Sequence, residues 1–325
     1  MIHHTTRREF LTTTAAAGMG LLCSRQLPAA ASSDSKSRKK ALIGRPDRKT
    51  LEELKAAGFG GIEANVWGVS SEEAAGYRKE ADALGMRIHS VLRGWTNFNS
   101  PDKQQVAADI ASVEKALHTS QIYGADALLL VPCRLLAKVD VPRPEDFQIE
   151  FAEQTGHISR VVAGDNTPYE GYIKAHNEAI DASRQALEKL IPVAEKTEVV
   201  IALENVWSNL WVKPKLFANF VKSFESQWLQ TYFDIGNHVK YAPPEEWIQT
   251  LGKTIVKIHV KDFEVNRSAP NGGKFVDIRE GDVDWPSVMK ELDNIGYHGW
   301  MTIEGSGGLS MQERSRRLDL ILAGS

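Results

Sequence analysis

The feature that most constrains this fold is an eightfold alternation of short apolar runs with amphipathic helical stretches, which begins near residue 41. Eight such units in about 285 residues favour a closed (β/α)8 barrel over an open doubly wound sheet. No expected strand is followed by a GxGxxG or GxxxxGK[ST] loop, which weakens the open-sheet alternative further. We therefore predict an α/β protein with a single (β/α)8 barrel over residues 41–325.

One stretch interrupts this rhythm. Residues 132–172 separate the fourth expected strand from its helix, and this connection is too long for an ordinary barrel loop. We predict an insertion at about 132–172 that forms a lid or an entrance wall. The expected strands are Ala41–Ile43, Gly61–Val66, Arg87–Leu92, Ala127–Val131, Val199–Glu204, Thr231–Asp234, Ile255–Val260 and Trp300–Glu304.

The N-terminus resembles a twin-arginine export signal. Arg7 and Arg8 precede an uncharged run over residues 10–24, which is shorter than the roughly 20 residues that span a bilayer, and small residues follow at Ala29 and Ala31. We expect a signal peptide at 1–31, a linker at 32–40 and a periplasmic or extracellular protein without stable membrane association. A lipoprotein anchored through Cys23 and a short N-terminal helix are the alternatives.

The charge balance excludes a strongly basic nucleic-acid-binding protein. The chain has 39 Lys and Arg against 42 Asp and Glu, a formal net charge of −3, and 42% hydrophobic residues. Its two cysteines, Cys23 and Cys133, show no zinc-binding spacing and leave no internal disulfide after signal cleavage. The sequence therefore predicts an ordinary globular protein with no nucleic-acid partner.

Ionisable side chains occupy four consecutive expected strands at or near their carboxyl ends: Glu204, Asp234, His259 and Glu304. Active sites of such barrels lie at the carboxyl ends of the strands. Three carboxylates and one imidazole at a common point would repel one another unless a cation lay among them. Oxygen-rich ligands with one nitrogen suit Mn²⁺, Mg²⁺, Co²⁺ or Zn²⁺. For any one of these residues alone, a helix cap or a loop hydrogen bond is the simpler interpretation.

Four segments around these residues resemble the xylose-isomerase-like sugar (phosphate) isomerases and epimerases. This superfamily includes ketose 3-epimerases, hydroxypyruvate isomerases and inosose dehydratases. The resemblance implies that the four residues bind one divalent metal, most often Mn²⁺, and that Glu204 and Glu304 act as the acid/base pair. It also implies a small carbohydrate substrate and a homo-oligomer. The segments are Leu203-Glu204-Asn205-Val206-Trp207, Tyr232-Phe233-Asp234-Ile235-Gly236-Asn237, Ile258-His259-Val260-Lys261-Asp262-Phe263 and Thr302-Ile303-Glu304-Gly305.

The expected activity is a metal-dependent sugar isomerase or epimerase that transfers a proton next to a carbonyl through a metal-bound enediolate. An exported protein meets few sugar phosphates, so we expect a non-phosphorylated ketose or keto-sugar, although the loop 306–308 could bind a phosphate through its backbone. The alternative is a dehydratase, hydratase or lyase of the inosose or 3-keto-glycoside type. An endonuclease IV-like nuclease and a non-catalytic sugar-binding barrel are the remaining classes.

Further polar and aromatic residues near strand ends are candidates for substrate contacts. Each has a simpler interpretation as a loop, packing or buried polar residue, and solvated arginines are common in loops. The substrate-binding candidates are His238, Lys261, Asn205, Glu63, His89, Trp207 and Arg267.

Overall fold

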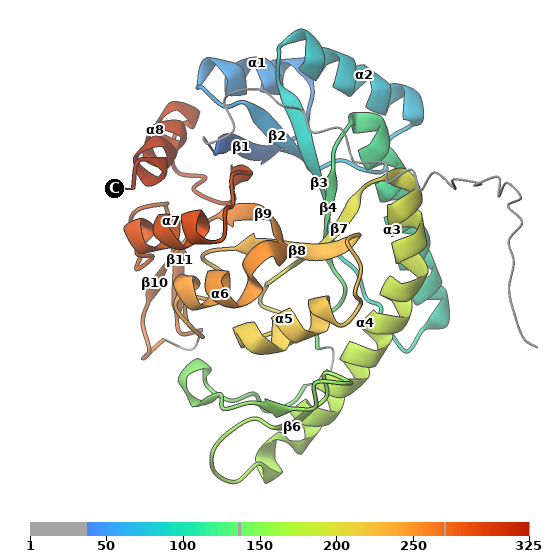
Figure 1. The fold of residues 1–325 in the computed structure, drawn as a ribbon, viewed down its shortest axis with the longest axis vertical. Helices are drawn as coiled ribbons and strands as arrows, with labels where there is room; N and C mark the ends of the chain where they lie inside the picture. Colours follow the sequence, from blue (N-terminus) through green and yellow to red (C-terminus); the bar gives the residue numbers. More distant parts are fainter. Residues whose placement is uncertain (1–37, 136–137, 270, 325) are drawn as a thin grey trace, which may run out of the picture. The chain divides into compact units, whose positions relative to one another are not determined.

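Eight parallel strands close into a barrel in the order β1-β12-β9-β8-β7-β4-β3-β2 in the computed structural model, which describes residues 38–135, 138–269 and 271–324. Helices surround the strands, as Figure 1 shows. The predicted (β/α)8 barrel is confirmed. The expected signal peptide at 1–31, and the expected linker up to residue 37, lie outside the described residues.

The barrel strands are short, and most of their side chains are buried. β1 begins at Lys39 rather than at residue 41, because Lys39 and Lys40 pair with Trp300 and Met301 of β12. The strands are β1 Lys39–Gly44, β2 Gly61–Ala64, β3 Arg87–Trp95, β4 Ala127–Val131, β7 Val200–Glu204, β8 Leu229–Asp234, β9 Ile255–Val260 and β12 Trp300–Ile303.

The surrounding helices begin at residues that the sequence marks as caps. Asp102 and Asp284 accept hydrogen bonds from backbone N–H groups in the first turns of α3 and α7, which satisfies donors that the helices themselves leave free. The helices are α1 Arg48–Ala56, α2 Ser71–Ala83, α3 Lys103–Tyr123, α4 Glu170–Thr197, α5 Pro214–Lys222, α6 Pro244–Leu251, α7 Trp285–Asn294 and α8 Met311–Leu322.

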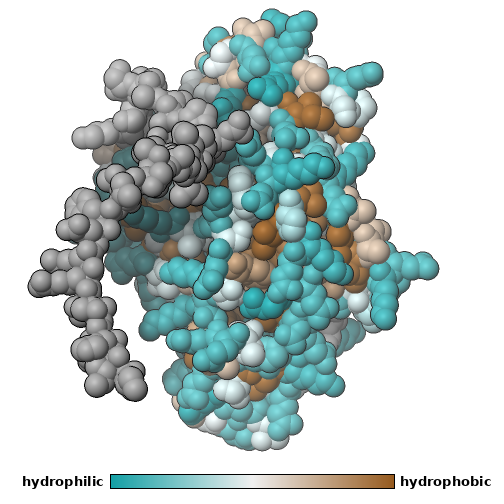
Figure 2. All heavy atoms as spheres, turned by 45° about the vertical axis from the view of Figure 1, so that its right-hand side comes forward, coloured by the Kyte–Doolittle hydropathy of each residue, from teal (hydrophilic) through white to brown (hydrophobic). Residues whose placement is uncertain are grey.

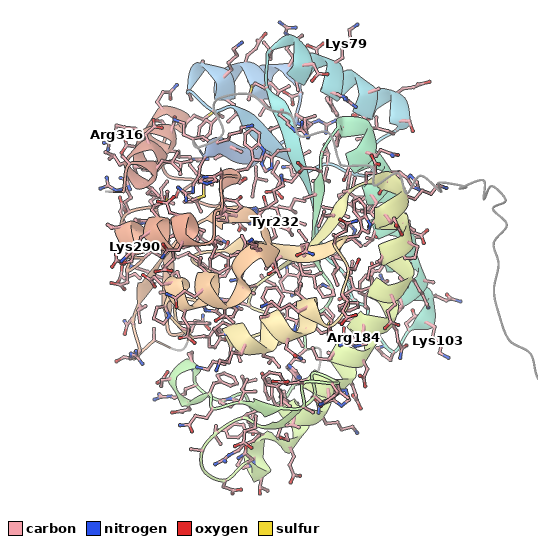
Figure 3. All side chains as sticks on the ribbon, in the orientation of Figure 1. Lys79, Lys103, Arg184, Tyr232, Lys290 and Arg316 are labelled. Carbon is pink, nitrogen blue, oxygen red and sulfur yellow. The ribbon has the colours of Figure 1, made fainter. Side chains whose placement is uncertain are left out.

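Alternation along the strands creates two cores. Leu129 and Ala202 pack inside the barrel with Tyr232, whereas Leu128 and Leu203 belong to the core between strands and helices. Figure 3 shows Tyr232 near the centre of the molecule, with labelled lysines and arginines on the outer helices. The face in Figure 2 is mostly hydrophilic, with small apolar patches. The packed side chains inside the barrel lie below the side chains at the strand ends and support them.

The insertion after β4 carries a short hairpin, β5 Glu150–Phe151 and β6 Ile158–Arg160. This hairpin packs on the N-terminal part of α4, where Asn177 exchanges two hydrogen bonds with the backbone of Ile158. In Figure 1 it lies at the edge of the molecule beside α4. The insertion also reaches other elements: Asn219 of α5 donates to the carbonyl of Glu153, and the backbone N–H of Leu135 donates to the carbonyl of Ser208 in the loop after β7. Its role as a lid or an entrance wall stays a prediction.

A second hairpin follows β9 directly. Its strands, β10 Asp262–Val265 and β11 Gly273–Val276, pair antiparallel. The carboxylate of Asp262 accepts hydrogen bonds from the backbone of Arg279 and from the indole of Trp285, and so ties the base of the hairpin to the start of α7. The hairpin is therefore fixed next to the strand that carries His259.

Within the part of the chain that the structure describes, no helix combines the length and the apolar character that a membrane span requires.

Candidate metal centre

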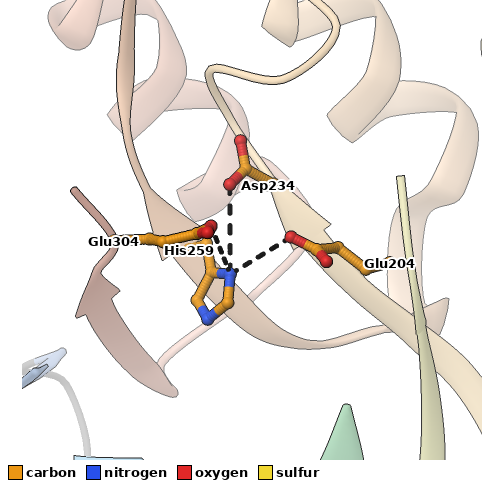
Figure 4. A group of neighbouring side chains, drawn as sticks. All are labelled: Glu204, Asp234, His259 and Glu304. Carbon is orange, nitrogen blue, oxygen red and sulfur yellow. Dashed lines mark hydrogen bonds and ion pairs between the residues drawn. The ribbon is translucent and has the colours of Figure 1, made fainter. Parts of the chain in front are cut away.

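Four ligand-bearing side chains meet at the carboxyl ends of β7, β8, β9 and β12. Glu204 and Asp234 end β7 and β8, His259 lies next to the end of β9, and Glu304 follows β12 directly. One ligand atom from each lies within 4.8 Å of all the others. Figure 4 shows the imidazole between the two glutamates, with Asp234 on a third side. The structure therefore brings together the four residues that the sequence predicts as metal ligands.

The free atoms of this cluster fit a divalent cation. His259 Nδ1 lies 3.3 Å from Glu204 Oε1 and 3.0 Å from Glu304 Oε2. Asp234 Oδ2 is buried and accepts no hydrogen bond, and the ammonium of Lys261 lies 3.5 Å from it. Buried carboxylate oxygens normally have donors, and a hard cation satisfies them equally well. Three carboxylates and one imidazole would hold Mn²⁺ or Mg²⁺.

The second nitrogen of His259 is held from inside the barrel. Its Nε2 donates to Glu63 Oε2 over 2.6 Å, and Tyr232 donates its hydroxyl to the same oxygen over 2.9 Å. Both His259 and Glu63 are fully buried. Burial lowers the pKa of His259, but Glu63, Glu304 and Glu204 outweigh it and raise this pKa well above its usual value, so in the metal-free cluster both ring nitrogens donate. The hydrogen bond from Nε2 to Glu63 leaves Nδ1 as the nitrogen that would give up its proton to bind a metal.

Lys261 brings a positive charge to the edge of the cluster. Its ammonium lies 2.8 Å from Glu304 Oε2 and 3.5 Å from Asp234 Oδ2, and it donates to Asn237 Oδ1 over 3.2 Å. Asn237 in turn donates to Glu204 Oε1 over 3.3 Å. Lys261 and Asn237 therefore connect carboxylates that come from three strands.

The two glutamates differ in pKa. Burial raises the pKa of Glu204, and the charge of Glu304 raises it further, against the opposing effects of His259 and Lys261. Burial also raises the pKa of Glu304, but the charges of His259 and Lys261 outweigh it and hold this pKa well below its usual range. Burial raises the pKa of Asp234 to about 8. In the metal-free cluster Glu304 is thus the carboxylate that stays ionised most readily.

The loop after β8 is built to hold Asp234 and Lys261 close together. Asn205 donates to the carbonyl of Asp234 over 2.8 Å and accepts from its backbone N–H over 2.7 Å. A Cβ on Gly236 would lie 2.7 Å from the carbonyl oxygen of Lys261, so only glycine permits this close approach. Asn205 is fully buried and bonds the backbone of Asp234, and its expected substrate contact stays a prediction.

Three further substrate candidates have partners inside the protein. Glu63 binds His259, as described above. His89 is fully buried, lies 3.1 Å from the hydroxyl of Thr302 and stacks on Trp300 at 4.6 Å. His238 donates Nε2–H to the carbonyl of Val206 over 3.2 Å, and burial lowers its pKa to about 3. In this structure all three side chains are buried and bonded within the protein, and their expected substrate contacts stay predictions.

The last two candidates lie at the surface near the hairpin. The Trp207 indole donates to the carbonyl of Asn237, and its ring packs 4.8 Å from Phe275. Arg267 lines a cavity of about 460 Å³ formed with Lys240 and Asp284, and none of the four metal-cluster residues lines that cavity. Trp207 is therefore beside the metal cluster, whereas the structure does not bring Arg267 to it.

Sequence reasoning missed Tyr232, Asn237 and Phe275. Tyr232 lies two residues before Asp234, so the twofold period of a strand places both side chains inside the barrel. Asn237 is part of the segment that carries the family resemblance, but nothing in the sequence indicates that it bonds Glu204. Phe275 lies in the long loop after β9, where no pattern marks the hairpin.

The chain belongs to the xylose isomerase-like TIM barrel family, which it matches over residues 51–319. L-ribulose-5-phosphate 3-epimerase UlaE of Escherichia coli O1:K1 / APEC is 29% identical over 157 residues, which make up 48% of this chain and 52% of that protein. The chain thus spans about half the length of the curated relatives it matches.

Solved structures extend the similarity over most of the chain. A D-tagatose 3-epimerase-like protein has 18% identity and a TM-score of 0.66, with 88% of this chain and 97% of that chain covered. The 3-keto-D-glucoside 4-epimerase YcjR from E. coli has 12% identity and a TM-score of 0.64, with 88% and 100% covered. At these identities the similarity establishes the fold.

Proposed function

We propose that this chain is a divalent-metal-dependent sugar isomerase or epimerase that transfers a proton next to the carbonyl of a non-phosphorylated ketose or keto-sugar. The observation that carries the proposal is the placement of Glu204 and Glu304, whose carboxylate oxygens lie 3.3 and 3.0 Å from His259 Nδ1 and come from different strands. Two carboxylates that face one point from different sides can serve the two faces of a planar carbanion.

The two glutamates share the proton transfers. One of Glu204 and Glu304 takes the proton from the carbon next to the carbonyl, and the other delivers a proton to the opposite face, which inverts the stereocentre. The divalent metal, when bound, polarises the carbonyl and its neighbouring hydroxyl and so makes the carbon-bound proton more acidic. Asp234 and His259 would hold the metal together with the two glutamates, and Lys261 pairs with Glu304.

The relatives support this class of reaction. UlaE is named as an L-ribulose-5-phosphate 3-epimerase and YcjR as a 3-keto-D-glucoside 4-epimerase. Both names describe inversion at a carbon of a sugar. The preference for a neutral sugar rests on the expected export signal, because phosphorylated sugars are cytoplasmic metabolites.

Solvent exchange tests the proposal. The Mn²⁺-loaded protein is incubated in D₂O with D-fructose, D-tagatose or methyl 3-keto-α-D-glucoside, and the products are followed by NMR. We expect deuterium at a carbon that keeps its hydroxyl group, with exchange abolished by EDTA. An enone that absorbs in the ultraviolet would show elimination and would favour the dehydratase or lyase alternative. Absence of exchange with sugars of every class, phosphorylated ones included, would contradict the proposal.

A further inference from the structure

An aromatic side chain lies exposed next to the metal cluster. Among the residues that the structure describes, Phe275 is the only large hydrophobic side chain that is exposed, at 42% of its surface. It lies on β11, in the hairpin that follows the strand of His259. An apolar ring left in water beside a polar cluster is a feature of ligand sites, which combine apolar walls with a few polar groups.

The Phe275 ring is fixed by its neighbours. It packs 4.8 Å from the ring of Trp207 at 32° and 5.3 Å from that of Phe263 at 71°. The Trp207 ring also contacts Lys240, whose ammonium lies 3.4 Å from the centre of the ring. Because Trp207 is occupied by these two contacts, Phe275 is the member of the aromatic group that offers a free surface.

A cavity joins Phe275 to the metal cluster. It has a volume of about 480 Å³ and is lined by Phe275, Asp277 and Glu280 on the hairpin side and by Lys261, Glu304 and Ser306 on the other. The Lys261 ammonium lies 4.8 Å from the centre of the Phe275 ring and 2.8 Å from Glu304 Oε2. A ligand with its reacting carbons at Glu304 would therefore extend over the Phe275 ring.

The charges around this cavity oppose a phosphate. Asp277, Glu280 and Glu304 contribute carboxylates, of which Glu280 is paired with Arg317 over 2.7 Å. Lys261, the one cation among the described residues that line the cavity, is already paired with Glu304. The hydroxyl of Ser306 accepts a hydrogen bond from the backbone of Ile278. A Cβ on Gly308 would lie 3.5 Å from Asp277 Oδ2, so the loop 306–308 has a carboxylate beside it. Carboxylates accept hydrogen bonds from hydroxyl groups and repel phosphate.

We propose that Phe275 and Asp277 form a carbohydrate subsite next to the metal cluster, in which a neutral sugar ring stacks its C–H face on Phe275, donates hydroxyls to Asp277, and excludes a phosphorylated sugar. Aromatic rings offer a large flat apolar surface for such contacts. This inference rests on the proposed function and names its substrate class.

Binding and exchange measured on the same variants test the subsite. The full chain loaded with Mg²⁺ is titrated with methyl 3-keto-α-D-glucoside, D-fructose and D-fructose 6-phosphate. We expect the wild type to bind the first sugar more tightly than the phosphate, F275A to weaken that binding at least tenfold, and F275W to restore it. D277K should reduce the difference in affinity between the neutral and the phosphorylated sugar. K274A is the matched control, because the neighbouring Lys274 is exposed and pairs with Glu264 instead.

The outcomes separate the two proposals. Equal affinity of wild type and F275A for the neutral glycoside, or tighter binding of the phosphate by the wild type, would overturn the subsite, as would no binding of either neutral sugar. If the neutral sugars bind, F275A weakens them and no deuterium exchange occurs with any sugar, the subsite stands and the proposed function fails. Thermal melting of F275A shows whether a loss of binding reflects a loss of folding.

Discussion

Glu63 and His259 form a buried pair across the barrel interior, with Glu63 Oε2 2.6 Å from His259 Nε2. The pair keeps a proton on Nε2, so that Nδ1 is the imidazole nitrogen that would bind a metal among the three carboxylates. We expect E63Q to weaken Mn²⁺ binding roughly 10- to 100-fold, as changes behind a ligand histidine usually do. Isothermal titration calorimetry measures this affinity.

Tyr232 provides the control for this prediction. Its hydroxyl also donates to Glu63, over 2.9 Å, but it touches no oxygen of the three ligand carboxylates. Y232F should therefore weaken Mn²⁺ binding less than E63Q. A Mn²⁺ affinity of E63Q equal to that of the wild type would show that Glu63 does not position His259.

Isosteric changes at the two glutamates of the metal centre should separate their role in proton transfer from their role in metal binding. E204Q and E304Q remove a carboxylate that moves a proton, and a positioned acid or base contributes about 10²- to 10⁴-fold to the rate. We expect each variant to lose at least roughly 100-fold in the rate of deuterium exchange at saturating Mn²⁺. Metal content measured on the same samples separates lost chemistry from lost metal, and near-normal turnover in either variant would refute its role.

Metal removal should destabilise the folded protein, because buried carboxylates then face one another without a cation. A ligand that binds only the native state adds about 2.7 kcal/mol at a free concentration of 100 times Kd. We expect Mn²⁺ to raise the melting temperature and EDTA to reverse the increase. D234N, which loses one charged ligand, should show a smaller increase at the same Mn²⁺ concentration, and an identical one would argue against metal binding at this cluster.

Acid should destabilise the protein through His176 on α4. This side chain is buried, donates to the carbonyl of Leu210, and has its pKa lowered by burial from 6.5 to about 4. The unfolded chain takes up this proton at a higher pH than the folded one, so stability falls as the pH drops from 6.5 to 4. The loss is about 3 kcal/mol for this group.

H176Q keeps an N–H donor but does not titrate. Denaturant unfolding at pH 7 and pH 4 should therefore show a smaller loss in H176Q than in the wild type, while other groups titrate in both proteins and cancel. Equal losses in the two proteins would mean that His176 is not responsible.

Export by the twin-arginine pathway stays a prediction, since Arg7 and Arg8 lie outside the described residues. Changing both to lysine keeps the charge but removes the guanidinium pair. We expect the R7K/R8K chain to remain in the cytoplasmic fraction, whereas the unchanged chain is recovered from the periplasm or medium. Export of the lysine variant at the normal level would remove this interpretation.

The barrel and its four candidate metal ligands could be predicted from the sequence because each depends on local periodicity. A strand that ends in Glu204 or Asp234 displays that side chain at the carboxyl end whatever the neighbours are. Fold prediction therefore needed only the count of alternations and the residue at each strand end.

The contacts behind the ligands could not be predicted. Glu63 and His259 are 196 residues apart, and their pairing depends on how the barrel closes across its interior. The hairpin of β10 and β11 could not be predicted either, because Phe275 lies in a stretch of sequence without strand-like alternation. The insertion packs against α4 through the two hydrogen bonds between Asn177 and Ile158 and through the buried side chain of Ile158, and none of these contacts follows a sequence period.

The close contact at Gly236 has a practical consequence for anyone who alters this protein. The backbone of Gly236 lies directly against that of Lys261, two residues beyond His259, so any side chain introduced there would push the histidine-bearing strand. Residue 236 is thus closed to engineering, whereas Lys274 and Phe275 of β11 are exposed and can be varied. Libraries that aim at new sugars are best confined to such exposed positions of the hairpin.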